Sequence, residues 1–498
     1  MDAKQKSEPA RQAGALVFGT TLATLSSALT PLLIVRLIGK ADVARLLSIT
    51  LVYETLAMLL STGLPYAMLY QLSNREPAAR AAIARRIARS ASLLGLGGAA
   101  LVALVAGIVA LLPESLTTPT FRTQLHLTLI LAPSLAADLP FRLLPNLLIA
   151  EGRARHSAGL QVVRTIGLTL ATLVPLALKT SVATVIVVYA VVRWAFGLVL
   201  LWEFRHLYGK LERVPSPLGV RALFAFALPL GATEVLGQVN AQLDRWLILF
   251  ALPGTRFADY QAGAWQVPIV GTIAFSVGAA YTPEFVRLFQ ARQPYAALEI
   301  WQRSIHKVTL VVVPITMALV VAADELMPLM FTQAYASAAD IFRCYSVLTF
   351  LRVASFGTVI IAAGKPGLIL RAAALGLFYN ALFGIPLVLT LGFIGPALGA
   401  ALAFVLHVVT YVYFISRAAE VPMRRVFPVR NYLRVFALAC IAGAVGLAVK
   451  HALHVPAAVL LGVEITTVLG VFALLGSVTK TIEPGDWAFL KDWLKLKH

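Results

Sequence analysis

The residues best suited to chemistry are charged and amide side chains inside one long apolar stretch, residues 222–252. They are Glu234, Gln238, Asn240, Asp244 and Arg245. Glu234, Gln238 and Arg245 follow one another at helical spacing, so they lie on one face of a helix. Hydrocarbon offers such a face no hydrogen-bond partner. We therefore expect this face to line a water-filled cavity or to pack on another polar helix.

Three more arginines stand inside apolar stretches. Arg142 follows Asp138 by four residues, so the two side chains can pair on one helix, and that pair can be purely structural. Arg193 and Arg352 have no acid nearby in the sequence, and Glu54 stands in the middle of another stretch. An unpaired arginine in lipid is costly, which favours a cavity position for Arg193 and Arg352. Because these arginines outnumber well-placed acids, the pattern favours an anionic substrate.

Composition indicates what kind of protein positions these residues. Of 498 residues, 59% are hydrophobic and only 13% are charged. These fractions exclude an ordinary soluble enzyme and a disordered chain, and they indicate a multi-pass membrane protein. The 42 Lys and Arg against 23 Asp and Glu give a net charge of +19. Most of this charge lies in alternate short loops, which predicts that those loops are cytoplasmic without requiring nucleic acid as a partner.

The stretches predict an all-α polytopic membrane protein with about 14 transmembrane helices and both termini in the cytoplasm. Similar segments, Leu148–Arg153 and Ile360–Lys365, end stretches that lie six apart. An even separation preserves orientation, so we expect two six-helix bundles related by a pseudo-two-fold axis along the membrane normal. The predicted parts are an N-terminal lobe (1–215), a C-terminal lobe (216–430), and two further helices with an amphipathic cytoplasmic tail (431–498).

Two segments have an apolar side and a basic side, residues 283–303 and the tail from Trp487 to Leu494. We expect both to lie at the inner membrane interface, with partner binding as the alternative. The sequence holds no HExxH, Walker A or GxSxG motif, so we expect no enzyme activity, metal or cofactor. Cys344 and Cys440 stand in apolar stretches and do not indicate a disulfide.

Four short segments resemble one transporter family. The segment Ile34–Asp42 is similar to its first loop, although Ala44-Arg45 departs from the Tyr-Gly common there. Asp244-Arg245 resembles the family's "iDr" element. Glu151–Arg153 resembles its loop after the fourth span, and Tyr281–Pro283 resembles its connection between the eighth and ninth spans. The chain is thus similar to bacterial polysaccharide transporters. These are the O-antigen and exopolysaccharide lipid-linked oligosaccharide flippases of the multidrug/oligosaccharidyl-lipid/polysaccharide exporter superfamily.

The resemblance implies two lobes around a central cavity that opens alternately to each side of the bacterial inner membrane. It implies that the substrate is an undecaprenyl-pyrophosphate-linked oligosaccharide, an O-antigen or exopolysaccharide repeat unit. For the pyrophosphate we expect contacts from Arg142, Arg193, Arg245 and Arg352. For the sugars or a coupling ion, H⁺ or Na⁺, we expect contacts from Glu234, Gln238, Asn240 and Asp244. Expected partners are membrane lipid and a glycan polymerase or other assembly proteins, around a monomeric transporter.

Several other functions fit the sequence. A cation-coupled multidrug antiporter needs acidic side chains that line the cavity. A peptidoglycan lipid-precursor flippase shares the same predicted architecture. A membrane-embedded glycan polymerase or ligase needs a large outer loop, which the spacing of the apolar stretches does not provide. A scaffold that transports nothing is the remaining alternative, and it requires the polar face of residues 222–252 to be packed dry.

Overall fold

The structure of the protein is a computed structural model. It describes residues 22–61, 63–72, 75–113, 119–212, 214–252, 254–265, 267 and 281–486. All regular secondary structure in this part of the chain is helical, as the sequence predicts. The predicted tail from Trp487 to Leu494 lies outside the described residues, as does most of the predicted span 257–281.

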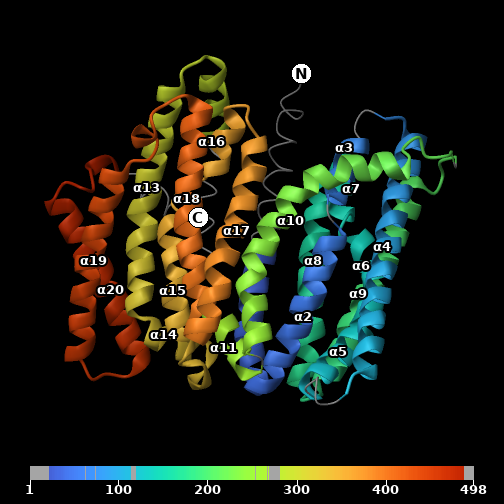
Figure 1. The fold of residues 1–498 in the computed structure, drawn as a ribbon, viewed down its shortest axis with the longest axis horizontal. Helices are drawn as coiled ribbons and strands as arrows, with labels where there is room; N and C mark the ends of the chain where they lie inside the picture. Colours follow the sequence, from blue (N-terminus) through green and yellow to red (C-terminus); the bar gives the residue numbers. More distant parts are fainter. Residues whose placement is uncertain are drawn as a thin grey trace. The chain divides into compact units, whose positions relative to one another are not determined.

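The chain folds as two compact units, Met1–Val239 and Asn240–His498, which we describe separately (Figure 1). The division falls within the long helix α10 (Val220–Ala251). The predicted lobe boundaries at residues 215 and 430, and the separate C-terminal part, stay predictions.

The first unit begins with a described helix Leu22–Leu37. It continues with α2 (Lys40–Leu60), α3 (Leu64–Leu72), α4 (Pro77–Leu111), α5 (Pro119–Leu131), α6 (Leu135–Phe141), α7 (Leu144–Ala150), α8 (Ala154–Ala177) and α9 (Val182–Tyr208). The stretch from α5 to α7 is broken twice. A short 3-10 turn, η2 (Ala132–Ser134), separates α5 from α6, and α6 ends one residue after Pro140. The helix is thus interrupted between Phe141 and Leu144, since Pro140 has no N–H to donate to the helical hydrogen bonds.

The second unit holds α11 (Thr255–Gly263), a helix over 281–290, α13 (Pro294–Val321), α14 (Ala323–Phe331), η3 (Gln333–Tyr335), α15 (Ala338–Leu351), α16 (Phe356–Ala362), α17 (Gly367–Leu391), η4 (Gly392–Ile394), α18 (Gly395–Ala419), η5 (Met423–Arg425), α19 (Val429–Ala452) and α20 (Ala457–Val478). Helix α13 packs against both α19 and α20. Its Trp301, Ile305 and Val312 are fully enclosed in the core of this unit. The last two helices are thus anchored by ordinary apolar burial.

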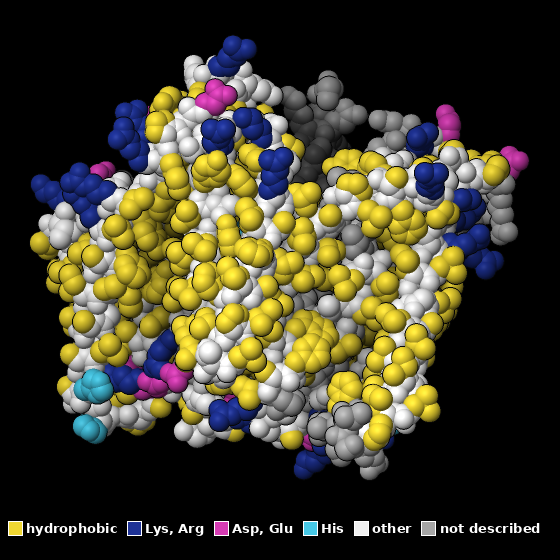
Figure 2. All heavy atoms as spheres, viewed as in Figure 1, with side chains coloured by type: hydrophobic (Ala, Val, Ile, Leu, Met, Phe, Trp, Pro, Cys, Tyr) yellow, Lys and Arg dark blue, Asp and Glu magenta, His cyan; other side chains and the backbone are white. Residues whose placement is uncertain are grey.

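Ten described segments are long and apolar enough to cross a membrane, or eleven when α10 is included as one bent span. One of the ten, Gly367–Ala419, comprises both α17 and α18. Figure 2 shows hydrophobic side chains over most of the visible surface and basic side chains mainly toward the upper and lower margins of the view. Such a surface is stable in lipid rather than in water. The protein is a multi-pass membrane protein, and the number of 14 spans stays a prediction.

The segment predicted to lie flat at the interface is built differently. Residues 281–290 form a helix in which Phe285 and Leu288 are buried in protein, while Arg287 stays exposed and pairs with Glu284. Its apolar side therefore packs on the core of the second unit instead of entering a lipid surface. An amphipathic pattern alone does not distinguish these two environments.

Candidate functional site

A cluster of five charged side chains lies inside the first unit and joins four helices. Its members, called the arginine cluster below, are Glu54 on α2, Asp138 on α6, Arg142 at the end of α6, Arg164 on α8 and Arg193 on α9. Arg142 donates from Nε to Asp138 at 2.8 Å and from Nη2 to Glu54 at 2.6 Å. The pairing of Arg142 with Asp138 is as the sequence predicts. The cluster holds one more cation than anions.

Arg193 is the central ion of the arginine cluster. Its Nη1 lies 2.5 Å from Asp138 Oδ2, its Nη2 lies 2.7 Å from Glu54 Oε1, and its side chain is 0% exposed. The guanidinium group also stacks on two rings, 4.3 Å from the centre of Tyr53 and 4.6 Å from that of Tyr189. Aromatic faces stabilise a cation that has lost its water. Arg193 is thus enclosed by protein on all sides.

This geometry corrects one expectation. The sequence shows no acid near Arg193 and favours a cavity position for it, whereas the structure buries it fully between two carboxylates. The partners come from α2 and α6, which are distant in sequence. Arg164, which is not among the predicted site residues, completes the arginine cluster with an ion pair to Asp138 Oδ1 at 2.9 Å.

Close packing brings α6 and its Asp138 into this position. Gly95 of α4 lies directly against the backbone carbonyl of Leu135, at the start of α6, where a Cβ atom has no room. On the other side, a Cβ at Gly197 of α9 would lie 2.7 Å from the Cβ of Ala137. Small residues at both contacts therefore let three helices approach closely around the buried carboxylate.

The arginine cluster is open at one edge. Arg142 and Arg164 are 20% and 25% exposed, and Glu54 is 34% exposed, whereas Asp138 is 1% exposed. These partly exposed members can exchange a protein partner for a ligand. The buried members Asp138 and Arg193 hold them in place. The open edge thus presents two guanidinium groups, whose chemistry suits an anion.

Two predicted residues on α10, Glu234 and Gln238, belong to the first unit and have exposed side chains. The hydroxyl group of Tyr66 on α3 forms a hydrogen bond with Glu234. Nearby, Gly63 has a φ of +70° and lies against the backbone of Ala227 at a distance that only glycine permits. This contact fixes α3 against α10 and so positions Tyr66 beside Glu234.

The other half of α10 carries Asn240, Asp244 and Arg245 in the second unit. Asn240 accepts hydrogen bonds from Asn380 Nδ2 at its carbonyl oxygen, 2.9 Å away, and at Oδ1, 3.0 Å away. Asp244 is 3% exposed and accepts a hydrogen bond of 3.1 Å from the Tyr260 hydroxyl. Arg245 is half-buried, and its Nε has no hydrogen-bond partner among the described residues. The two adjacent ions therefore have different environments, as their positions one residue apart on a helix require.

Arg352, predicted to lie mid-span, is the residue at which α15 ends. Its guanidinium carbon lies 5.4 Å from the ring centre of Phe404 on α18. The chain then continues without helix to α16, which begins at Phe356. The structure thus unites Arg142 and Arg193 in one cluster. It places Asn240, Asp244, Arg245 and Arg352 separately on the second unit.

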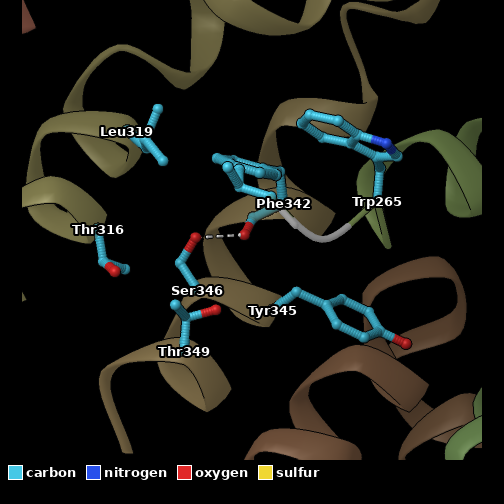
Figure 3. A pocket seen from close by; sticks show the side chains of 8 residues that line it. Trp265, Thr316, Leu319, Phe342, Tyr345, Ser346 and Thr349 are labelled. Atoms are coloured by element: carbon cyan, nitrogen blue, oxygen red, sulfur yellow. Dashed lines mark hydrogen bonds between the residues drawn. The ribbon is translucent and has the colours of Figure 1, made fainter. Parts of the chain in front are cut away.

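A small pocket in the second unit is lined by both polar and apolar side chains. Figure 3 shows Thr316, Ser346 and Thr349 on one side of it and Trp265 and Tyr345 on the other. The Ser346 hydroxyl already donates to the Phe342 carbonyl oxygen at 2.8 Å. The pocket has a volume of about 20 Å³, which holds about one water molecule. This pocket is too small to receive a sugar.

Solved structures of known transporters share the fold of this chain. The lipid II flippase MurJ in an inward closed conformation superposes with a TM-score of 0.74 at 14% identity, covering 93% of this chain and 98% of that protein. A MOP superfamily transporter from Pyrococcus furiosus gives a TM-score of 0.56 at 13% identity, covering 83% of this chain and 96% of that one. At such identities the similarity concerns the fold alone.

Sequence comparison adds a glycan transporter. A probable low-salt glycan biosynthesis flippase, Agl15 of Haloferax volcanii, is 24% identical over 222 residues, which are 44% of this chain and 46% of that protein. The alignment thus spans less than half the length of this relative. The family described as polysaccharide biosynthesis protein matches residues 10–289. Because this match covers more than half of the 498 residues, the chain belongs to the polysaccharide biosynthesis protein family.

Proposed function

We propose that this protein moves a diphosphate-linked oligosaccharide lipid across the bacterial inner membrane by alternating access, without making or breaking covalent bonds. Membership of the polysaccharide biosynthesis protein family and the similarity to a glycan flippase support this proposal. The observation that carries it is the arginine cluster, in which three guanidinium groups meet two carboxylates at membrane depth. Such an excess of positive charge is costly in lipid and favours an anionic ligand.

A diphosphate linker is the part of such a substrate that hydrocarbon excludes most strongly. Arginine suits this group, because its planar fork donates two parallel hydrogen bonds to phosphate oxygens. Arg142 and Arg164 are the partly exposed cations of the cluster, and we assign them to the diphosphate. On binding, phosphate oxygens replace Glu54 at Arg142, while buried Arg193 positions Asp138 and through it both guanidinium groups.

The other predicted residues retain complementary roles in this proposal. Glu234 and Gln238 are exposed and offer hydrogen bonds to sugar hydroxyl groups. Arg245 and Arg352 supply further cations, and Asn240 and Asp244 are assigned to sugar or coupling-ion contacts. The lipid part is proposed to be undecaprenyl and the glycan an O-antigen or exopolysaccharide repeat unit. The coupling ion is proposed to be H⁺ or Na⁺.

The test is glycan export by cells that depend on this protein. The double variant R142Q/R164Q should still insert, at a lower level because the cluster is weakened, and should lower surface glycan per inserted protein about 100-fold, because two charge-assisted hydrogen bonds to the diphosphate are lost. R142K/R164K keeps the charge without the planar fork and should fall between. R153Q/R155Q removes two exposed arginines outside the cluster and is the matched control. Wild-type export by R142Q/R164Q, at equal protein in the membrane, contradicts the proposal.

A second candidate function, flipping of the peptidoglycan lipid precursor, is favoured by the MurJ-like fold over 93% of the chain. It predicts that this protein sustains growth of cells depleted of their own lipid II flippase. The proposal above predicts no rescue, since a repeat-unit glycan differs from that precursor in its sugars. Drug efflux without glycan export instead identifies a multidrug antiporter.

A further inference from the structure

A wide basic groove lies on the first unit, and none of its lining residues belongs to the arginine cluster. Its walls come from the first half of α4, from the C-terminal end of α9 and from residues 209–211 and 214–216, which follow α9. The groove has a volume of about 1300 Å³. Such a volume holds a lipid headgroup together with part of an acyl chain.

The lining of this groove carries five cations, and none of its described residues is an acid. The cations are Arg85, Arg86, Arg89, Arg205 and Lys210. Among the described residues, no ion pair reaches any of the five. Exposed Glu212 lies in the segment that follows α9, but it does not line the groove and pairs with none of these cations. The two acids on the neighbouring elements have other partners. Glu151 binds Arg80 and Tyr208, and Glu203 is buried against His156. The positive charge of the groove is thus left for a ligand.

One of the five cations has a structural task. Arg85 donates from Nη2 to the carbonyl oxygen of Tyr208, 2.9 Å away, where α9 ends. This bond ties α4 to α9 and offsets the partial negative charge of the helix end. This contact therefore fixes α4 relative to α9, and both helices line the groove. Arg86, Arg89, Arg205 and Lys210 remain for an anion.

The groove is apolar below its cations. Pro140, Leu200, Leu201 and Phe204 line it, and Leu201 is 64% exposed. Leu198, also on α9, extends this apolar surface and is 66% exposed. A soluble phosphate has no apolar part that could pack on these side chains. A lipid can place its acyl chain against them and its phosphate among the cations.

We propose that this groove is a binding site for the phosphate headgroup of an anionic phospholipid. The proposal does not rest on the proposed transport function. Basic loop residues that only fix membrane orientation need no cavity, and they tolerate neighbouring acids. Here four cations converge on one hollow that the described acids leave unneutralised, above an apolar wall. Guanidinium groups bind phosphate oxygens in pairs, which favours a headgroup held at a fixed place.

The experiment measures phosphatidylglycerol binding to the full-length protein in phosphatidylcholine nanodiscs, by native mass spectrometry and by titration. The variant R86Q/R89Q/R205Q/K210Q should bind on the order of 100-fold more weakly, because each cation near a phosphate surface contributes severalfold. Arg85 is left unchanged to preserve the contact between α4 and α9. The control R153Q/R155Q removes two exposed arginines of the same unit outside the groove and should bind like the wild type.

Three further measurements make the result decisive. Equal thermal unfolding of the quadruple variant and the wild type excludes misfolding as the cause of weaker binding. Inorganic pyrophosphate should not displace phosphatidylglycerol at equal concentration, because it lacks the chain. Undecaprenyl pyrophosphate that displaces phosphatidylglycerol at equal concentration would identify a substrate site and overturn the proposal. Undiminished phosphatidylglycerol binding by the quadruple variant overturns it as well.

Discussion

Arg193 shows how a single ion can be stable at membrane depth without water. Two carboxylates neutralise its charge, and two aromatic rings cover the faces of its guanidinium group. The Asp138 carboxylate also accepts from Arg142 and Arg164, so each ion of the cluster depends on the others. Removing one member therefore affects the folded protein as well as any ligand.

Arg193→Met should destabilise the protein by about 3–5 kcal/mol, because it leaves the buried Asp138 carboxylate with less compensation. Arg193→Lys keeps the charge but loses the fork that reaches two acids, and it should cost less. Thermal unfolding of the purified protein measures both changes. R155Q, which changes an exposed arginine, should stay within about 0.5 kcal/mol of the wild type. An Arg193→Met protein as stable as R155Q contradicts the coupling of these charges.

At this scale the sequence predicts pairs within a helix but not between helices. The spacing of Asp138 and Arg142 is sufficient to expect their ion pair, because helix geometry fixes the distance. The partners of Arg193 come from two other helices, and periodicity holds no information about which helices meet. Arg164 is missed for the same reason, because its partner Asp138 lies on another helix, 26 residues earlier in the chain.

Helix α4 depends on glycine where it meets α6. Gly95→Ala places a methyl group against the Leu135 carbonyl, so α6 must move away from α4. We expect a loss of about 1–3 kcal/mol, as for overpacking. Gly97→Ala is the matched control, because a Cβ there meets open space on the same helix, and alanine raises helix stability by up to about 1 kcal/mol. If both variants unfold at one temperature, the close approach has no energetic role.

The short helix α14 is held to its neighbours by ions. Asp324 accepts from Arg343 at 2.6 Å and from Lys450 at 3.0 Å, which links α14 to α15 and α19. Burial alone raises the pKa of Asp324, but the hydrogen bonds from these two cations outweigh it and hold its pKa below the usual value. A lowered pKa in the folded state stabilises the protein above the pKa of the unfolded state. This stabilisation is lost as the pH falls through the folded pKa.

Asp324→Asn should therefore lower the unfolding temperature most at neutral pH, and the difference from the wild type should shrink towards acidic pH. Unfolding is measured in detergent between neutral pH and the acid limit of folding. Asp42→Asn is the control, since Asp42 is exposed and pairs with Arg45 on its own helix. A difference that is constant with pH contradicts a role for the Asp324 carboxylate.

The architecture of the whole molecule follows from composition more directly than its charged sites do. Long apolar stretches predict membrane helices, because a helix satisfies all backbone hydrogen bonds within the segment where hydrocarbon offers no partner. Ten such segments are present among the described residues. Boundaries are harder to predict where a stretch is interrupted. The region from α5 to α7 reads as one span, yet prolines divide it into three helices. Likewise α10 bends by 51° at Pro229, although its hydrophobic residues form one continuous stretch in the sequence.

The predicted topology can be tested at the two ends of one helix. Helix α8 has 24 residues, which is about 36 Å and enough to cross the bilayer. Basic residues cluster before it, so the side of Arg155 should be cytoplasmic and that of Ser181 external. Both positions are exposed. In a C344A/C440A background, S181C should react with a membrane-impermeant maleimide in spheroplasts, whereas R155C should react only after permeabilisation. The opposite labelling pattern would reverse the orientation and with it the cytoplasmic placement of both termini.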